Sequence, residues 1–209
     1  MALINETNGS SLSGLVGRVV VVKTKWGSYM RSAPQYSKGS WTDRQKVHRQ
    51  RFKRVSEFCR QFRETVIPQI WKDTNVRASG YALFLKANMQ AFSSQGELTD
   101  PALVKLSTGV LEFPQGLQLN AAQLMEGRLT VSWPDAGSGI RWRDELMAIA
   151  AGEGHYSDIL NTGILRGQKG GSFELPELKT DATHLYLFFG SKDRRSYSDS
   201  ECYSLIDAS

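Results

Sequence analysis

Residues 128–133 read Arg-Leu-Thr-Val-Ser-Trp, a stretch in which polar and apolar side chains alternate. Successive side chains of a strand point to opposite faces, so this alternation predicts a strand with one buried face. In residues 184–189, Leu185, Leu187 and Phe189 alternate with Tyr186 and Phe188, which also predicts a strand. We expect six apolar side chains from these two stretches to be buried between two sheets: Leu129, Val131, Trp133, Leu185, Leu187 and Phe189.

Further short apolar runs surround these two stretches. Residues 145–151 are apolar on both faces, which is typical of a central strand, and the turn residues Lys169-Gly170-Gly171 predict a hairpin. About seven short strands separated by turns predict an immunoglobulin-like or fibronectin-type β-sandwich over residues 101–209, although the Cys–Trp–Cys spacing of antibody domains is missing. The other strand candidates are residues 102–107, 109–113, 163–167, 172–175 and 196–206.

The preceding part, residues 17–98, has apolar residues at helical spacing. Thr42 and Gln45 form a capping-box pattern at the start of a predicted helix, and Pro68 interrupts that helix or begins another. A further helix is expected from about Gly80, and the domain boundary between residues 98 and 101. The predicted fold class is therefore α+β. The apolar face of the first helix is expected to contain Val47, Phe52, Val55, Phe58, Cys59, Phe62 and Val66.

The N-terminal part predicts a flexible arm over residues 1–16, which are polar and small, followed by a β-hairpin. Residues 19–24 are β-branched, Lys25-Trp26-Gly27 supplies a turn, and residues 28–32 form the return strand. A two-stranded ribbon is marginally stable alone, so we expect it to contact another surface. One hypothesis is that its aromatic rings dock on a partner; the alternative is that they pack on the first helix. The interface candidates are Trp26, Tyr29 and Arg31.

Charge is divided unevenly along the chain. Gly17 to Arg77 contains fifteen Lys and Arg against four acidic residues, a net +11, whereas the remainder has eleven basic and seventeen acidic residues, a net −6. The two parts therefore predict different neighbours. One hypothesis is non-specific binding of nucleic acid by the basic helix, and the alternative is that the aliphatic stems of these residues simply cover it. The nucleic-acid candidates are Arg44, Arg49, Arg51, Lys53, Arg54, Arg60 and Arg63.

Few features of the sequence predict chemistry. The three histidines, His48, His155 and His184, are far apart, and no His or Cys pair has the spacing of a metal site. A Gly-x-Ser-x-Gly nucleophile motif is missing. Cys59 and Cys202 predict small buried residues and not a disulfide framework. We therefore expect no catalytic residues, no metal, no cofactor and no small-molecule substrate.

The motif Gly14-x-x-Gly17-x-Val19, followed by Lys25-Trp26-Gly27-x-Tyr29-x-Arg31-x-x-Pro34, resembles an uncharacterised family found mainly in Bacteroides-type bacteria. In that family a W-K-G-x-x-Y-x-R-x-x-P signature precedes a basic helix. Its members end with patterns like those at residues 175–176, 184–189 and 197–200 of this chain. The signature departs in this chain because Lys25 precedes Trp26 and one residue before Tyr29 is lost. The resemblance implies a C-terminal immunoglobulin- or fibronectin-like sandwich and no particular activity.

These patterns together predict a non-catalytic structural or adaptor protein. We expect it to act through a protein partner or through self-association, in a larger phage-like assembly; non-specific nucleic-acid binding is the alternative. No apolar run approaches the ~20 residues that a membrane-spanning helix requires, and the N-terminus lacks the pattern of a signal peptide. The expected location is therefore the cytoplasm or a virion-like assembly, without membrane insertion.

Overall fold

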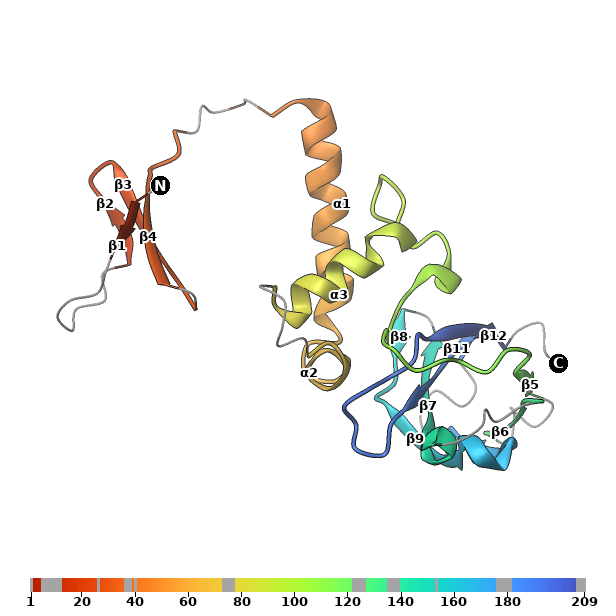
Figure 1. Ribbon diagram of the computed structural model, residues 1–209. Helices are drawn as coiled ribbons and strands as arrows, with labels where there is room; N and C mark the ends of the chain where they lie inside the picture. The colour runs from red at the N-terminus through yellow and green to blue at the C-terminus, as the bar shows by residue number, and fades with distance from the viewer. Residues whose placement is uncertain are drawn as a thin grey trace. The chain divides into compact units, whose positions relative to one another are not determined.

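The computed structural model describes residues 2–4, 13–25, 27–35, 39, 41–72, 78–121, 127–134, 140–152, 154–175 and 182–205. The chain forms two compact units, Met1–Asp43 and Arg44–Ser209 (Figure 1). The boundary expected between residues 98 and 101 therefore lies inside the second unit. The reason is that the helices and the sheets of this unit share a hydrophobic core, so they do not separate there.

The first unit is an antiparallel sheet with the strand order β1-β4-β3-β2. The predicted hairpin is present, because β3 pairs with β4 and places Val22 opposite Tyr29. Two three-residue strands lie in the stretch expected to be a flexible arm, and they widen the hairpin at both edges. Strands this short have no periodicity that a sequence could reveal. The strands are β1 (Ala2–Ile4), β2 (Gly14–Val16), β3 (Val19–Thr24) and β4 (Gly27–Ser32).

The second unit begins with three helices, which are α1 (Asp43–Arg60), α2 (Val66–Ile70) and α3 (Gly80–Asn88). The first starts directly after Thr42, as the capping pattern predicts, but it ends six residues before Val66. Pro68 lies inside α2, so this proline belongs to a separate helix and does not interrupt α1. At the start of α3, the hydroxyl of Ser79 accepts a hydrogen bond from the backbone N–H of Ala82 at 3.2 Å. Two short 3₁₀ helices follow, η1 (Met89–Ala91) and η2 (Pro101–Leu103).

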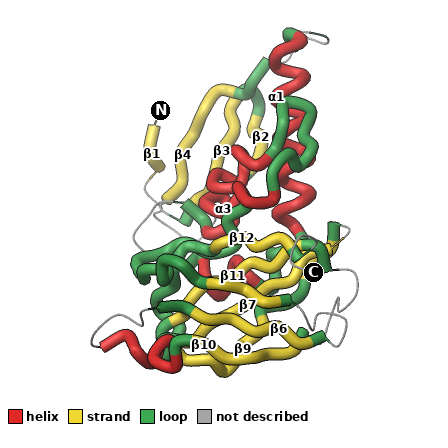
Figure 2. The backbone as a smooth tube through the Cα atoms, turned by 90° about the vertical axis from the view of Figure 1, so that its right-hand side faces the viewer, coloured by secondary structure: helices red, strands yellow, loops and turns green. Residues whose placement is uncertain are grey.

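Two antiparallel sheets complete the second unit (Figure 2). One has the order β10-β6-β5, and the other has the order β12-β11-β7-β8 with β9 also paired to β7. The fold is therefore a mixture of helices and antiparallel sheets, as expected for the α+β class. The strands are β5 (Gln118–Asn120), β6 (Arg128–Ser132), β7 (Glu145–Gly152), β8 (His155–Tyr156), β9 (Leu160–Leu165), β10 (Gly170–Glu174), β11 (His184–Gly190) and β12 (Glu201–Ser204).

The two sheets pack against each other through one hydrophobic cluster. Side chains of β6 and β10 meet those of β7 and β11 in this layer, and the rings of Trp133 and Phe189 contact edge to face at 5.4 Å. The burial expected for these side chains is confirmed, since none is more than 4% exposed. The six residues are Leu129, Val131, Trp133, Leu185, Leu187 and Phe189.

The opposite face of the larger sheet is covered by the helices. Met147 and Ile149 of β7, with Tyr186 and Phe188 of β11, join the same cluster as the buried residues of α1, α2 and α3. The strand β7 is thus buried on both faces, which confirms the prediction of a central strand for residues 145–151. This shared layer is why residues 44–209 form one unit.

Three strand predictions are wrong or too long. Residues 102–107 and 109–113 contain no strand, and Leu111 forms only an isolated bridge with Ser198. Val104, Leu106 and Leu111 are buried without being part of a strand, and Ala102 and Leu103 belong to η2. The last predicted strand, residues 196–206, shortens to β12.

The predicted hairpin at Lys169-Gly170-Gly171 is also absent, because β10 pairs with β6 and not with β9. The short helix η5 (Arg166–Gln168) leads the chain from one sheet to the other. Gly170 is required where the strands meet, since a Cβ atom there would lie 2.5 Å from the carbonyl oxygen of Val131. The glycines therefore mark a close approach between neighbouring strands and not a hairpin turn.

Candidate functional site

The first half of α1 is exposed on every side. All of its residues from Asp43 to Gln50 are solvent-exposed, whereas Val55 and Cys59 in the second half are completely buried. Val47 and Phe52, which the helical spacing assigns to the buried face, are 36% and 47% exposed. The core of the second unit does not reach the first turns of α1. The apolar residues of these turns therefore have no core surface to pack against.

The seven predicted nucleic-acid candidates do not form one set. Arg51 is half-buried and donates a hydrogen bond to the carbonyl oxygen of Met89. Lys53 and Arg54 lie 3.9 and 3.6 Å from Glu57 of the same helix. The remaining candidates, Arg44, Arg49, Arg60 and Arg63, are exposed.

Three of these cations lie on one side of α1. Positions 49, 53 and 60 are separated by four and seven residues, which places Arg49, Lys53 and Arg60 on the same face of a helix. Within the described parts of the chain, no ion pair joins Arg44, Arg60 or Arg63 to an acidic residue. The helix therefore presents a basic stripe, which also contains the acidic residue Glu57 between Lys53 and Arg60.

The interface candidates of the first unit lie on β4. Tyr29 and Arg31 are two residues apart and therefore point to the same face of the sheet, where they stand opposite Val22 and Val20 of β3. Tyr29 is half-buried and Arg31 is exposed. Trp26 lies outside the described residues, so its position in the turn stays a prediction.

The titratable residues considered for chemistry are separated in space as well as in sequence. His48 is exposed on α1, while His155 and His184 pair with the adjacent β7 residues Gly152 and Ala151. Adjacent strand residues point to opposite faces, so the two imidazoles lie on opposite faces of the sheet. No group of three metal-ligating side chains occurs among the described residues. None of the described helices is long and apolar enough to cross a membrane.

Several ionisable side chains with shifted pKa values belong to the core. Burial raises the pKa of the Asp144 carboxyl and lowers that of the Arg166 guanidinium, although these two groups lie 3.6 Å apart and attract each other. Burial also raises the pKa of the Cys59 thiol and of the Tyr156 hydroxyl, each to about 12. These shifts follow from loss of water around structural groups and identify no reactive side chain.

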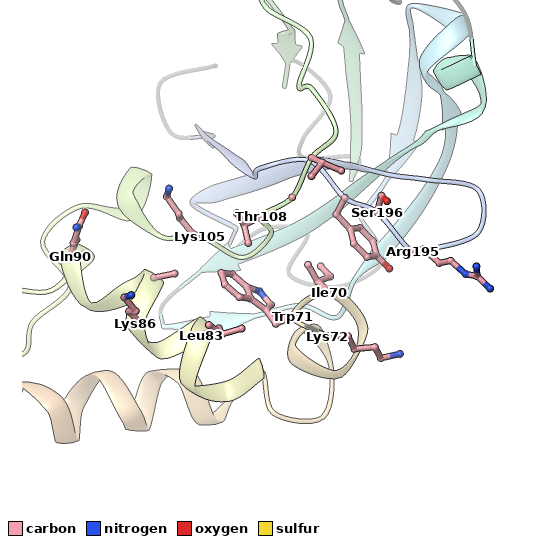
Figure 3. A pocket seen from close by; sticks show the side chains of 14 residues that line it. Ile70, Trp71, Lys72, Leu83, Lys86, Gln90, Lys105, Thr108, Arg195 and Ser196 are labelled. Carbon is pink, nitrogen blue, oxygen red and sulfur yellow. The ribbon is translucent and has the colours of Figure 1, made fainter. Parts of the chain in front are cut away.

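A groove of about 830 Å³ lies between α2, α3 and two later segments of the second unit (Figure 3). Sequence patterns do not reveal this groove, because its walls come from four separate parts of the chain. We call it the basic groove. Its lining residues used below are Trp71, Leu83, Val110, Tyr197 and the cations Lys72, Lys86, Lys105 and Arg195.

Asn88 joins two walls of the basic groove. This side chain is completely buried at the end of α3, where its amide group donates to the carbonyl oxygens of Phe84 and Lys105, both at 3.0 Å. Its own carbonyl oxygen accepts a hydrogen bond from the backbone N–H of Lys105 at 2.8 Å. One amide therefore holds the backbone of Lys105 against the helix that carries Lys86.

The floor of the basic groove is held rigidly. The indole N–H of Trp71 donates to the carbonyl oxygen of Leu106 at 2.9 Å, and its ring contacts Phe84 edge to face. The backbone N–H of Leu111 donates to the carbonyl oxygen of Tyr197 at 3.0 Å. A Cβ atom at Gly109 would lie 2.1 Å from that same oxygen, so only glycine permits this close approach.

Comparisons with known proteins add no assignment to this geometry. No protein-family model, no curated protein and no solved structure matches the chain. The function is therefore argued from the surfaces of the two units alone.

Proposed function

We propose that the protein is a non-catalytic adaptor that acts through protein–protein contacts, with its N-terminal sheet as the docking element. In this proposal the two sheets of the second unit are an immunoglobulin-like sandwich that carries the docking element in a larger, virion-like assembly. Membership of the Bacteroides-type family that the N-terminal motif resembles is part of the same proposal. Tyr29 and Arg31 are the proposed contact residues, together with Trp26.

The observation that supports docking is the composition of the N-terminal sheet. Alternation along β3 directs Val19 and Val21 to one face and Val20 and Val22 to the other, so both faces are apolar. Among the described residues of this unit, no helix and no second sheet lies over either face. Removing apolar side chains from water is favourable, so a partner surface would supply the cover that these valines lack.

The proposal is tested by the oligomeric state and by hydrogen exchange of the full chain. We expect light scattering to detect concentration-dependent self-association. Replacing Val20 and Val22 by Ser should abolish it, because the apolar face is lost. A matched control replaces Leu103, an exposed apolar residue of the second unit, by Ser and should leave self-association unchanged.

One result would contradict the docking proposal. If the chain is monomeric at every concentration and the backbone amides of β3 exchange as slowly as those of β7, the sheet is stable without a partner. The apolar faces of the sheet would then need no docking surface and would no longer support the proposal.

The second candidate function is non-specific nucleic-acid binding through α1. Its support is the basic stripe of Arg49, Lys53 and Arg60 on a helix whose first half is exposed on all sides. Phosphate contacts of this kind weaken with salt, with a log–log slope of about −0.9 for each phosphate neutralised. We expect a triple Ala variant of the stripe to reduce that slope. No gel shift at low salt would exclude this function.

A further inference from the structure

The basic groove has cations at both ends and an apolar floor. Figure 3 shows Lys86 and Lys105 toward one end, which we call the first cation pair, and Lys72 and Arg195 toward the other, the second cation pair. Between them lie the side chains of Trp71 and Leu83. A ligand that contacts both pairs must therefore be elongated.

Among the residues that the structure describes, the lining of the basic groove contains four cations and no acidic residue. In the part of the chain that the structure describes, no ion pair engages Lys72, Lys86 or Lys105, and Arg195 pairs with the exposed Asp193 at 3.7 Å. Asp199, an exposed residue that is not among the lining residues, accepts hydrogen bonds from the Thr108 hydroxyl and the Gly109 N–H, which hold it in place. The groove is therefore complementary to a negatively charged ligand.

The aromatic residues of the basic groove argue against a nucleic acid. Single-stranded nucleic acids bind proteins by stacking bases on exposed ring faces. Trp71 and Tyr197 are only 7% and 5% exposed, so neither offers a face to a base. They form a rigid apolar floor instead, beside Val110, which is 75% exposed on the rim. An apolar side chain can cover such a floor without stacking.

We propose that the basic groove binds an extended acidic peptide segment of a partner protein. Carboxylates of this peptide contact the two cation pairs, and an apolar side chain between them lies on the floor near Trp71. An extended backbone suits the open, elongated shape, and long Lys and Arg side chains can follow carboxylates at varied positions. This site is separate from the N-terminal sheet, so either proposal can fail without the other.

The test selects short random peptides from a displayed library against the immobilised full chain. We expect the enriched sequences to place Asp or Glu on both sides of an apolar residue. The best synthetic peptide should bind about tenfold more weakly to the double variant Lys86→Glu/Lys105→Glu, because two attractive charges become repulsive. The double variant Lys53→Glu/Arg60→Glu makes the same change of net charge on α1 and should bind the peptide like the unaltered protein.

Several outcomes would overturn the proposal. Selection of no peptide, or of peptides without acidic residues, would do so, as would equal weakening by the two double variants. A further contrary outcome is saturable binding of octyl phosphate or single-stranded DNA, as detected at the backbone amides of Lys86 and Lys105. If no peptide competes with that binding, the groove belongs to another ligand class. Circular dichroism of each variant confirms folding, which exposed lysine positions should preserve.

Discussion

The strands β3 and β11 are both rich in apolar residues, but their surroundings differ completely. In β11, all five residues from Leu185 to Phe189 are inaccessible to solvent, since a second sheet covers one face and helices cover the other. In β3, only Val21 among the four valines is buried. The comparison teaches that a strand's burial depends on the layers around it, and the uncovered valines of β3 are the basis of the docking proposal.

The largest expected effect contrasts one side chain from each strand. Replacing Phe188 by Ala should reduce the free energy of unfolding of the second unit by about 3 to 5 kcal/mol, because it leaves a cavity between sheet and helices. Replacing Val20 by Ala in β3 should change the free energy of unfolding of the second unit by less than about 0.5 kcal/mol. Urea denaturation monitored by tryptophan fluorescence measures both. Equal losses would show that the two units unfold as one.

A smaller effect is expected for the buried ion pair Asp144–Arg166. Replacing Arg166 by Met should cost about 3 kcal/mol near pH 8, because a buried carboxylate loses its partner. The loss should shrink as the pH falls, because Asp144, whose pKa burial already raises, then takes up a proton. The exposed pair Arg128–Glu174 is the control, and Arg128→Met should cost less than about 1 kcal/mol. A loss independent of pH would contradict this account.

The last effect concerns alkaline pH. Burial raises the pKa of Cys59 from 9.0 and that of Tyr156 from 10.0, each to about 12. The unfolded chain loses these protons first, so stability is complete below about pH 9 and falls as pH rises toward about 12, by about 1.4 kcal/mol per pH unit for each group. Tyr156→Phe should make the decline shallower. Urea titrations across this range provide the measurement.

Strands with clear alternation could be predicted from sequence, as could helix starts with capping residues. Residues 128–133 contain a strand for that reason, residues 19–24 contain one because they are β-branched, and Thr42 directly precedes α1. The domain boundary could not be predicted, because Tyr186 and Phe188 look the same in sequence whether a helix or another sheet covers them. The immunoglobulin-like topology stays a proposal.

The basic groove was beyond prediction for a different reason. Lys72, Lys105 and Arg195 are unremarkable surface cations in sequence, and their proximity depends on buried hydrogen bonds that join distant segments. Asn88 is the clearest example, since a polar residue near the end of a helix is usually a cap or a solvated side chain. Only the fold shows that it holds the backbone of Lys105.

The double-sided burial of β7 and β11 has a consequence for how the chain finds its fold. A slip of one residue exchanges the two faces of a strand, and polar side chains on one face normally prevent it. Here both faces are apolar, so polarity cannot exclude the shifted pairing. Side-chain size and one hydrogen bond therefore exclude the shifted register. The Tyr186 hydroxyl donates to the carbonyl oxygen of Pro101 at 2.9 Å, a partner available only on the helical side of the sheet. Tyr186→Phe should therefore increase misregistered, aggregation-prone species during refolding more than it lowers native stability.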